Sequence, residues 1–160
     1  MNDALFIESL AARLHVDDTE FELLKDEIYR VQAGLAGEEK LRYTLQDYPF
    51  KQAVRIFYDF QCMNERGFSH QIDALVVTSR FVLILESKHL SGTLLYKRDV
   101  HEFSRLSHDG ITTNFKNPFD QAFRHQLFLE HYFSSLGIHV PVRYVVVNTN
   151  LRAKLDASLF

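Results

Sequence analysis

The chain has 160 residues, of which 46% are hydrophobic and fourteen are Phe, and its formal net charge is −3. This size and hydrophobicity are typical of one globular domain with a buried core, which excludes an intrinsically disordered protein. The small negative charge excludes a generally basic surface for nucleic acid, and the single cysteine, Cys62, excludes an internal disulfide and suits a reducing compartment.

Two helices are predicted in the N-terminal third of the chain. The first covers residues 3–13, and the second begins near Asp17 with an acidic first turn. Gly34 and Gly37 are expected to interrupt or kink the second helix, which ends before Pro49. The N-terminus has no basic leader and no stretch is long enough to span a membrane, so we expect a cytoplasmic protein without membrane contact.

Residues 71–92 predict a β-hairpin with a short polar turn and are the most informative part of the chain. If the hairpin is symmetric about this turn, Asp73 lies opposite Glu86, with Cβ atoms about 4.5–5.5 Å apart. Lys88 follows Glu86 by two residues and therefore shares its face. These charges are costly to bury unless a metal or phosphate group binds them. The alternative is an ion-pair cluster near the surface with no further role.

Other elements are predicted on both sides of the hairpin. Strands are expected at residues 53–60, 93–96, 101–106 and 143–148, the last of them fully buried. Asn117 as N-cap and Pro118 at the first position begin a helix that ends at Gly137. Its buried side is expected to comprise Phe119, Ala122, Phe123, Leu127, Phe133 and Leu136. The core order is helix, three-strand meander, helix and strand, which predicts an α/β protein.

Four short motifs occur along the chain in a specific order and spacing. They are GLAGE at residues 34–38, QID at 71–73, LESKHLSG at 85–92 and NPFDQ at 117–121. The set resembles the G-x-x-G-E, I-D, E-x-K-x-x-S-G and N-P-x-x-Q motifs of the nuclease-related domain (NERD) family, in the PD-(D/E)xK restriction-endonuclease-like superfamily. Two residues depart from the family pattern: Ala74, where a polar residue or His is frequent, and His89, where Asn is frequent.

The resemblance implies both a fold and a domain division. Residues 34–160 would form a nuclease domain with a restriction-endonuclease-like α/β core, and residues 1–33 an N-terminal helical extension. Further domains beyond residue 160 and a homodimer both stay open. The partner implied is nucleic acid, DNA in preference to RNA.

The resemblance also implies a metal-dependent nuclease that hydrolyses phosphodiester bonds. Asp73, Glu86 and Glu38 would hold Mg²⁺ or Mn²⁺, hard ions that prefer oxygen ligands. Lys88 would orient or deprotonate the attacking water and offset charge on the phosphate, with Gln121 in support. The alternative function is a non-catalytic module that keeps the nuclease fold to bind nucleic acid or protein.

Each of these roles competes with a simpler interpretation. Glu38 could be a solvated helix residue, as we expect for its neighbour Glu39, and Gln121 could be an exposed amide. His125 and His131 have the wrong spacing for an H-E-x-x-H zinc site. No Walker or dinucleotide-binding glycine pattern is present.

Overall fold

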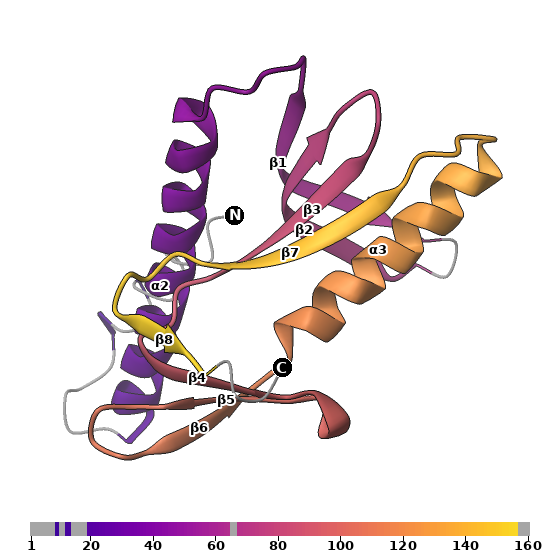
Figure 1. Ribbon diagram of the computed structural model, residues 1–160. Helices are drawn as coiled ribbons and strands as arrows, with labels where there is room; N and C mark the ends of the chain where they lie inside the picture. The colour runs from indigo at the N-terminus through magenta and orange to yellow at the C-terminus, as the bar shows by residue number, and fades with distance from the viewer. Residues whose placement is uncertain (1–8, 10–11, 14–18, 65–66, 157–160) are drawn as a thin grey trace.

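The computed structural model describes residues 9, 12–13, 19–64 and 67–156, so nearly all of the helix predicted at residues 3–13 lies outside the described part. The elements in chain order are α2 (Thr19–Asp47), β1 (Arg55–Met63), β2 (Ser69–Val77), β3 (Val82–Lys88), β4 (Gly92–Lys97), the 3₁₀ turn η1 (Arg98–Val100), β5 (Glu102–Leu106), β6 (Thr112–Phe115), α3 (Pro118–Ser135), β7 (Val142–Asn148) and β8 (Ala153–Leu155). The strands form two four-stranded sheets, which confirms the predicted α/β class (Figure 1). None of the helices in the described part is long and apolar enough to cross a membrane.

The first sheet has the strand order β1-β2-β3-β7, with an antiparallel meander followed by parallel β7. The predicted hairpin register is confirmed: Val77 pairs with Val82 and Ala74 with Leu85. The backbone pairing of β2 with β3 stops at Ala74, one pair before Asp73 would meet Glu86. The two strands therefore separate where the acidic residues begin.

The two long helices cover opposite faces of the first sheet (Figure 1). Leu129 of α3 belongs to the core cluster with Ile84, whereas Leu41 of α2 packs with Leu85. Successive strand residues point to opposite faces of a sheet, so Ile84 and Leu85 of β3 each pack against a different helix. This packing fixes both helices relative to the end of the β2–β3 hairpin.

Helix α2 is continuous through Gly34 and Gly37, so the expected interruption is wrong. Gly37 is buried, and a Cβ added there would lie 3.0 Å from the Cβ of His89 and 3.2 Å from Oγ1 of Thr149. The glycine lets the helix approach the sheet closely without breaking. The next residue, Glu38, is thereby held beside the end of β3.

Helix α3 begins as predicted, and its buried side was predicted in part: Ala122 is buried, and Phe119 and Phe133 are partly buried against core clusters. The Asn117 side chain accepts a hydrogen bond from the Phe119 amide at 3.0 Å, and Pro118 occupies the first position. The buried residues are Pro118, Ala122, His125 and Leu129, whereas Phe123, Leu127 and Leu136 are 47%, 49% and 56% exposed. The prediction assigned only apolar residues to the buried face of the helix, but this face also includes a histidine, His125.

Strand β7 is also less buried than predicted. It lies at the edge of the first sheet, and Val145 is 45% exposed. Val142 and Tyr144 on the other face pack into the core near α3. A hydrophobic run therefore predicted the strand correctly but not its position at an edge.

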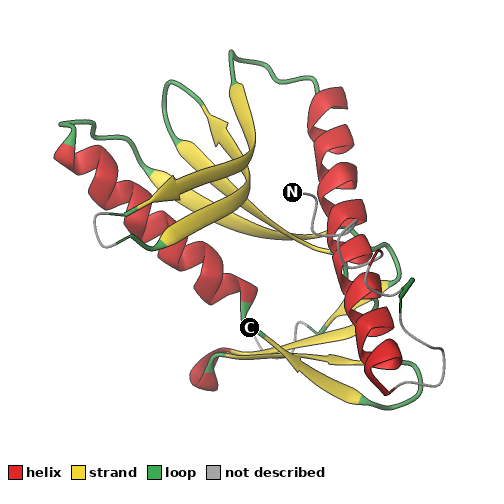
Figure 2. Ribbon diagram, turned by 180° about the vertical axis from the view of Figure 1, so that it is seen from behind, coloured by secondary structure: helices red, strands yellow, loops and turns green. Residues whose placement is uncertain are grey.

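The second sheet has the order β6-β5-β4-β8, and it includes two strands, β6 and β8, that were not predicted. Its core consists of Leu94, Tyr96 and Phe103, and Phe119 from the first turn of α3 packs against them. The rings of Tyr96 and Phe119 stack with centroids 4.6 Å apart. Figure 2 shows this sheet beside the N-terminal half of α2.

Candidate active site

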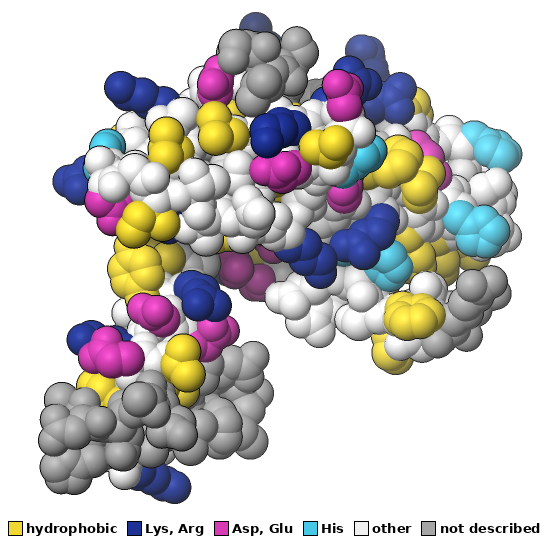
Figure 3. Space-filling view, turned by 90° about the horizontal axis from the view of Figure 1, so that it is seen from below, with side chains coloured by type: hydrophobic (Ala, Val, Ile, Leu, Met, Phe, Trp, Pro, Cys, Tyr) yellow, Lys and Arg dark blue, Asp and Glu magenta, His cyan; other side chains and the backbone are white. Residues whose placement is uncertain are grey.

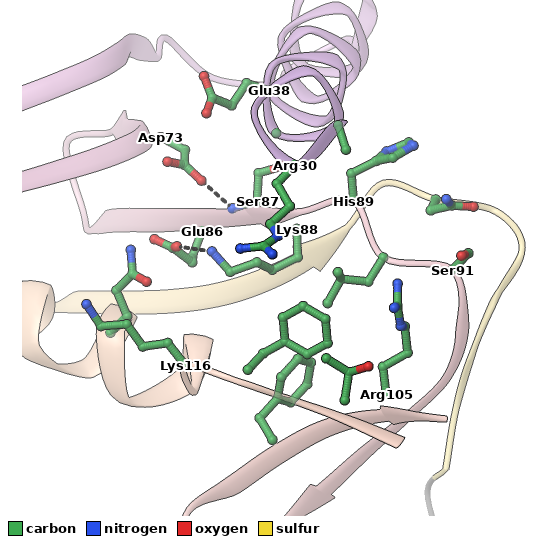
Figure 4. Close-up of a pocket in the computed structure, with 18 of the residues that line it drawn as sticks. Arg30, Glu38, Asp73, Glu86, Ser87, Lys88, His89, Ser91, Arg105 and Lys116 are labelled. Carbon is green, nitrogen blue, oxygen red and sulfur yellow. Dashed lines mark hydrogen bonds and ion pairs between the residues drawn. The ribbon is translucent and has the colours of Figure 1, made fainter. Parts of the chain in front are cut away.

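One cavity of about 1030 Å³ lies where α2, the separated ends of β2 and β3, and the second sheet meet. All five residues predicted from the sequence line it, namely Glu38, Asp73, Glu86, Lys88 and Gln121. Figure 4 shows the carboxylates of Asp73 and Glu86 near Lys88, with Glu38 entering from the helix above. The structure thus brings the predicted residues together, while their catalytic roles stay predictions.

Glu86 is the most deeply buried charged residue of the cavity, with 1% of its surface exposed. Its Oε1 accepts a hydrogen bond from Nζ of Lys88 at 2.7 Å, and its Oε2 is buried with no partner among the described residues. Burial raises the pKa of Glu86 to about 7, although the neighbouring Lys88 ammonium opposes this rise. One carboxylate oxygen is therefore available for a cation.

Asp73 fills the gap where the β2–β3 backbone pairing stops. Its Oδ2 accepts a hydrogen bond from the backbone N–H of Ser87 at 2.6 Å, in the manner of a strand carbonyl. Burial raises the pKa of Asp73, while the hydrogen bond from Ser87 and the charge of Lys88 lower it. The hydrogen bond fixes the direction of the carboxylate beside Glu86.

Glu38 and Gln121 complete the predicted set from the two helices. Burial raises the pKa of Glu38, and the negative charge of Asp73 adds to the rise. The adjacent Glu39 is exposed and does not line the cavity, as we expected. Gln121 lies in the first turn of α3 and lines the cavity.

The donor set fits a hard divalent cation. The described residues contain no group of three or more His, Cys, Asp or Glu side chains placed to hold a metal as they stand. Mg²⁺ needs few protein ligands, however, because it retains several waters and accepts one or two carboxylates. Asp73 and Glu86 supply such a pair, and the Oε2 atom of Glu86 lacks a partner in this part of the chain.

A pair of histidines lies behind this site and was not predicted. Nδ1 of His70 and Nδ1 of His125 are 3.1 Å apart, so one ring donates and the other accepts. Burial lowers the pKa of His125 to about 4, and the ring of His70 stacks on Phe128 with centroids 4.1 Å apart. Burial also lowers the pKa of His70, and the pair joins β2 to α3.

Basic residues other than Lys88 also lie at the cavity. Lys116 lines it, whereas Lys97 forms an exposed ion pair with Glu102 at 3.4 Å. Arg30 and Arg105 also line it and were missed. Without knowledge of β6 and the second sheet, the direction of Arg105 cannot be read from the sequence.

The comparison with protein families identifies the family of this chain. The fold is a mixed α/β core whose hairpin presents two acids and a lysine in one cavity. The family model for the nuclease-related domain matches residues 33–149, and the chain belongs to this NERD family. Comparisons with curated proteins and with solved structures give no match.

Proposed function

We propose that this protein is a metal-dependent nuclease that hydrolyses phosphodiester bonds of DNA on a restriction-endonuclease-like core. The observation that carries the proposal is the meeting of Asp73, Glu86 and Lys88 in one cavity, with one oxygen of the buried Glu86 lacking a partner in the described part of the chain. Membership of a nuclease-related family supports the same class of reaction.

Mg²⁺ or Mn²⁺, when bound, would polarise the scissile phosphate and assist the attack of water. Asp73 and Glu86 would hold the ion, and the hydrogen bond from Ser87 keeps Asp73 in place for this. Nζ of Lys88 lies 2.7 Å from Oε1 of Glu86, and the ammonium would stabilise charge on a phosphate bound beside this carboxylate. Gln121 can orient a water or a phosphate oxygen from α3.

A non-catalytic binding module is the second candidate. It is favoured by the ion pair of Lys88 with Glu86, because the ammonium already neutralises the buried carboxylate. In that function the three charges would only stabilise the end of the hairpin. Metal binding separates the two candidates, because a scaffold has no need of a divalent ion here.

The test combines calorimetry with a cleavage assay. We expect Mg²⁺ or Mn²⁺ to bind the wild-type protein with measurable heat, and the Asp73→Asn variant to lose this heat. We also expect cleavage of linear DNA in either metal and none in EDTA, because the carboxylates alone cannot polarise the phosphate. Absence of both metal binding and cleavage would leave the binding module as the function.

Glu38 and Glu39 offer a matched comparison within one helix turn. We expect Glu38→Gln to lower the rate of cleavage by about tenfold to a hundredfold, the range for outer ligands and their supports. Glu39→Gln should cleave like the wild type, because Glu39 is exposed and lies outside the cavity. Initial rates at equal Mg²⁺ concentration measure both, and equal rates for the two variants would remove Glu38 from the site.

A further inference from the structure

The cavity has a basic wall, formed by Arg30, Arg105 and Lys116, in addition to its acidic end. The three side chains come from α2, from β5 and from the segment between β6 and α3. Figure 4 shows Arg30 reaching down from the helix towards Lys88 and Arg105 rising from the second sheet. Figure 3 shows basic and acidic side chains close together on this face of the molecule. Because the whole chain has a net charge of −3, an anion would have to be held by a local group of basic residues such as this one.

Arg105 is directed into the cavity by the register of the second sheet. It lies opposite Leu94 of β4 and Thr113 of β6. Phe103, two residues earlier on the same strand, shares its face and belongs to the core of this sheet. Arg105 therefore lies on the same face of the sheet as these core residues, at the end of the apolar cluster, and it lines the cavity.

The surroundings of Arg105 leave its hydrogen-bonding capacity unused. Its Nε is buried without a hydrogen-bond partner, and within the described ranges it forms no ion pair. Its guanidinium lies over the ring of Phe115, 5.4 Å from the centroid. A Cβ added to Gly92 would lie 3.5 Å from Cγ of Arg105, so the aliphatic part of the Arg105 side chain is closely packed. A held arginine that lines the cavity and has no acidic partner in the described part of the chain is suited to a phosphate group, which accepts two hydrogen bonds in parallel.

We propose that the basic wall binds the phosphates that flank the reacting phosphate along one nucleic-acid strand, with Arg105 as the main anchor. The inference rests on the proposed nuclease function and adds a substrate-positioning subsite to it. The volume of about 1030 Å³ lies at the upper limit for a small-molecule pocket, which fits several linked nucleotides. Positive side chains along a groove are the usual means of following a sugar-phosphate backbone.

The experiment measures binding separately from cleavage. A fluorescein-labelled DNA oligonucleotide is titrated by fluorescence anisotropy at several salt concentrations, in EDTA and again in Ca²⁺. We expect Arg105→Gln to weaken binding about tenfold and to reduce the slope of log K against log salt by about one. In cleavage assays with Mg²⁺, its KM should rise about tenfold with little change in kcat, because it contacts phosphates that do not react.

Arg80→Gln is the matched control, with the same change of charge. Arg80 lies exposed in the hairpin turn, at the end of the strands opposite to Asp73 and Glu86, and its side chain does not line the cavity. We expect this variant to bind and cleave like the wild type. Lys116→Gln is a second test on an exposed residue whose loss does not threaten folding, and it should weaken binding less than Arg105→Gln.

The outcomes distinguish this inference from the proposed function. If the wild type cleaves but Arg105→Gln and Lys116→Gln both keep its KM and its salt slope, the basic wall does not bind the flanking phosphates. The proposed nuclease function is then unaffected. If binding depends on Arg105 but no metal supports cleavage, the nuclease is wrong and the nucleic-acid subsite stands. A wild-type protein that binds no oligonucleotide in either EDTA or Ca²⁺ overturns the subsite.

Discussion

Asp73→Asn is expected to reduce the rate of DNA cleavage in saturating Mg²⁺ by about a thousandfold, the effect of losing a principal electrostatic group of an active site. The asparagine has nearly the shape of the aspartate, and its side-chain oxygen can still accept the hydrogen bond of the Ser87 amide. The backbone around the split of β2 and β3 should therefore stay intact. The variant would lose the negative charge beside Glu86 and, with it, one ligand of the proposed metal site.

Single-turnover cleavage rates measure this effect, and thermal unfolding verifies that the variant is folded. Asp47→Asn is the control, because Asp47 is exposed at the far end of α2 and does not line the cavity. Lys88→Met should lose activity to a similar extent, since it keeps the apolar stem and removes the ammonium. A rate for Asp73→Asn within a few-fold of the wild-type rate would show that the acidic pair is not the catalytic group.

The hairpin could be predicted because its sequence restricts the pairing strongly. An even turn between two apolar strands leaves one register that places Thr78 opposite Phe81, and the Thr78 amide donates to the Phe81 carbonyl at 3.0 Å. This register alone brings Asp73 and Glu86 to the same end of the hairpin. The N-cap at Asn117 depends only on neighbouring residues of the same segment, so the start of α3 was also predicted correctly.

The second sheet and the basic wall could not be predicted, because they depend on contacts between distant segments. Strand β8 has three residues and pairs with β4 some sixty positions earlier, and no periodic pattern marks so short a strand. The direction of Arg105 follows only from this sheet. On α3, three apolar residues that were expected to be buried are exposed, whereas His125 is buried and contacts His70.

The stability of the metal-free protein should fall as the pH rises through the range between the ordinary pKa of Glu86, 4.5, and its value in the folded protein, about 7. Between these values the folded state holds a proton that the unfolded state has already released, so rising pH favours unfolding. A shift from 4.5 to about 7 corresponds to roughly 3 kcal/mol, so we expect a loss of about 3 kcal/mol across this range. The raised pKa values of Asp73 and Glu38 act in the same direction.

Glu86→Gln should remove most of this pH dependence and make the metal-free protein more stable than the wild type above pH ~8. The glutamine keeps the volume of a side chain that is 1% exposed and no longer carries a charge that burial disfavours. Urea unfolding in EDTA across this pH range measures the effect, with Glu39→Gln as the exposed control. A variant that is less stable than the wild type at high pH would show that the ion pair with Lys88 outweighs the cost of burial. A gain in stability together with a loss of metal binding would identify Glu86 as an acid whose buried charge serves the proposed site and not the fold.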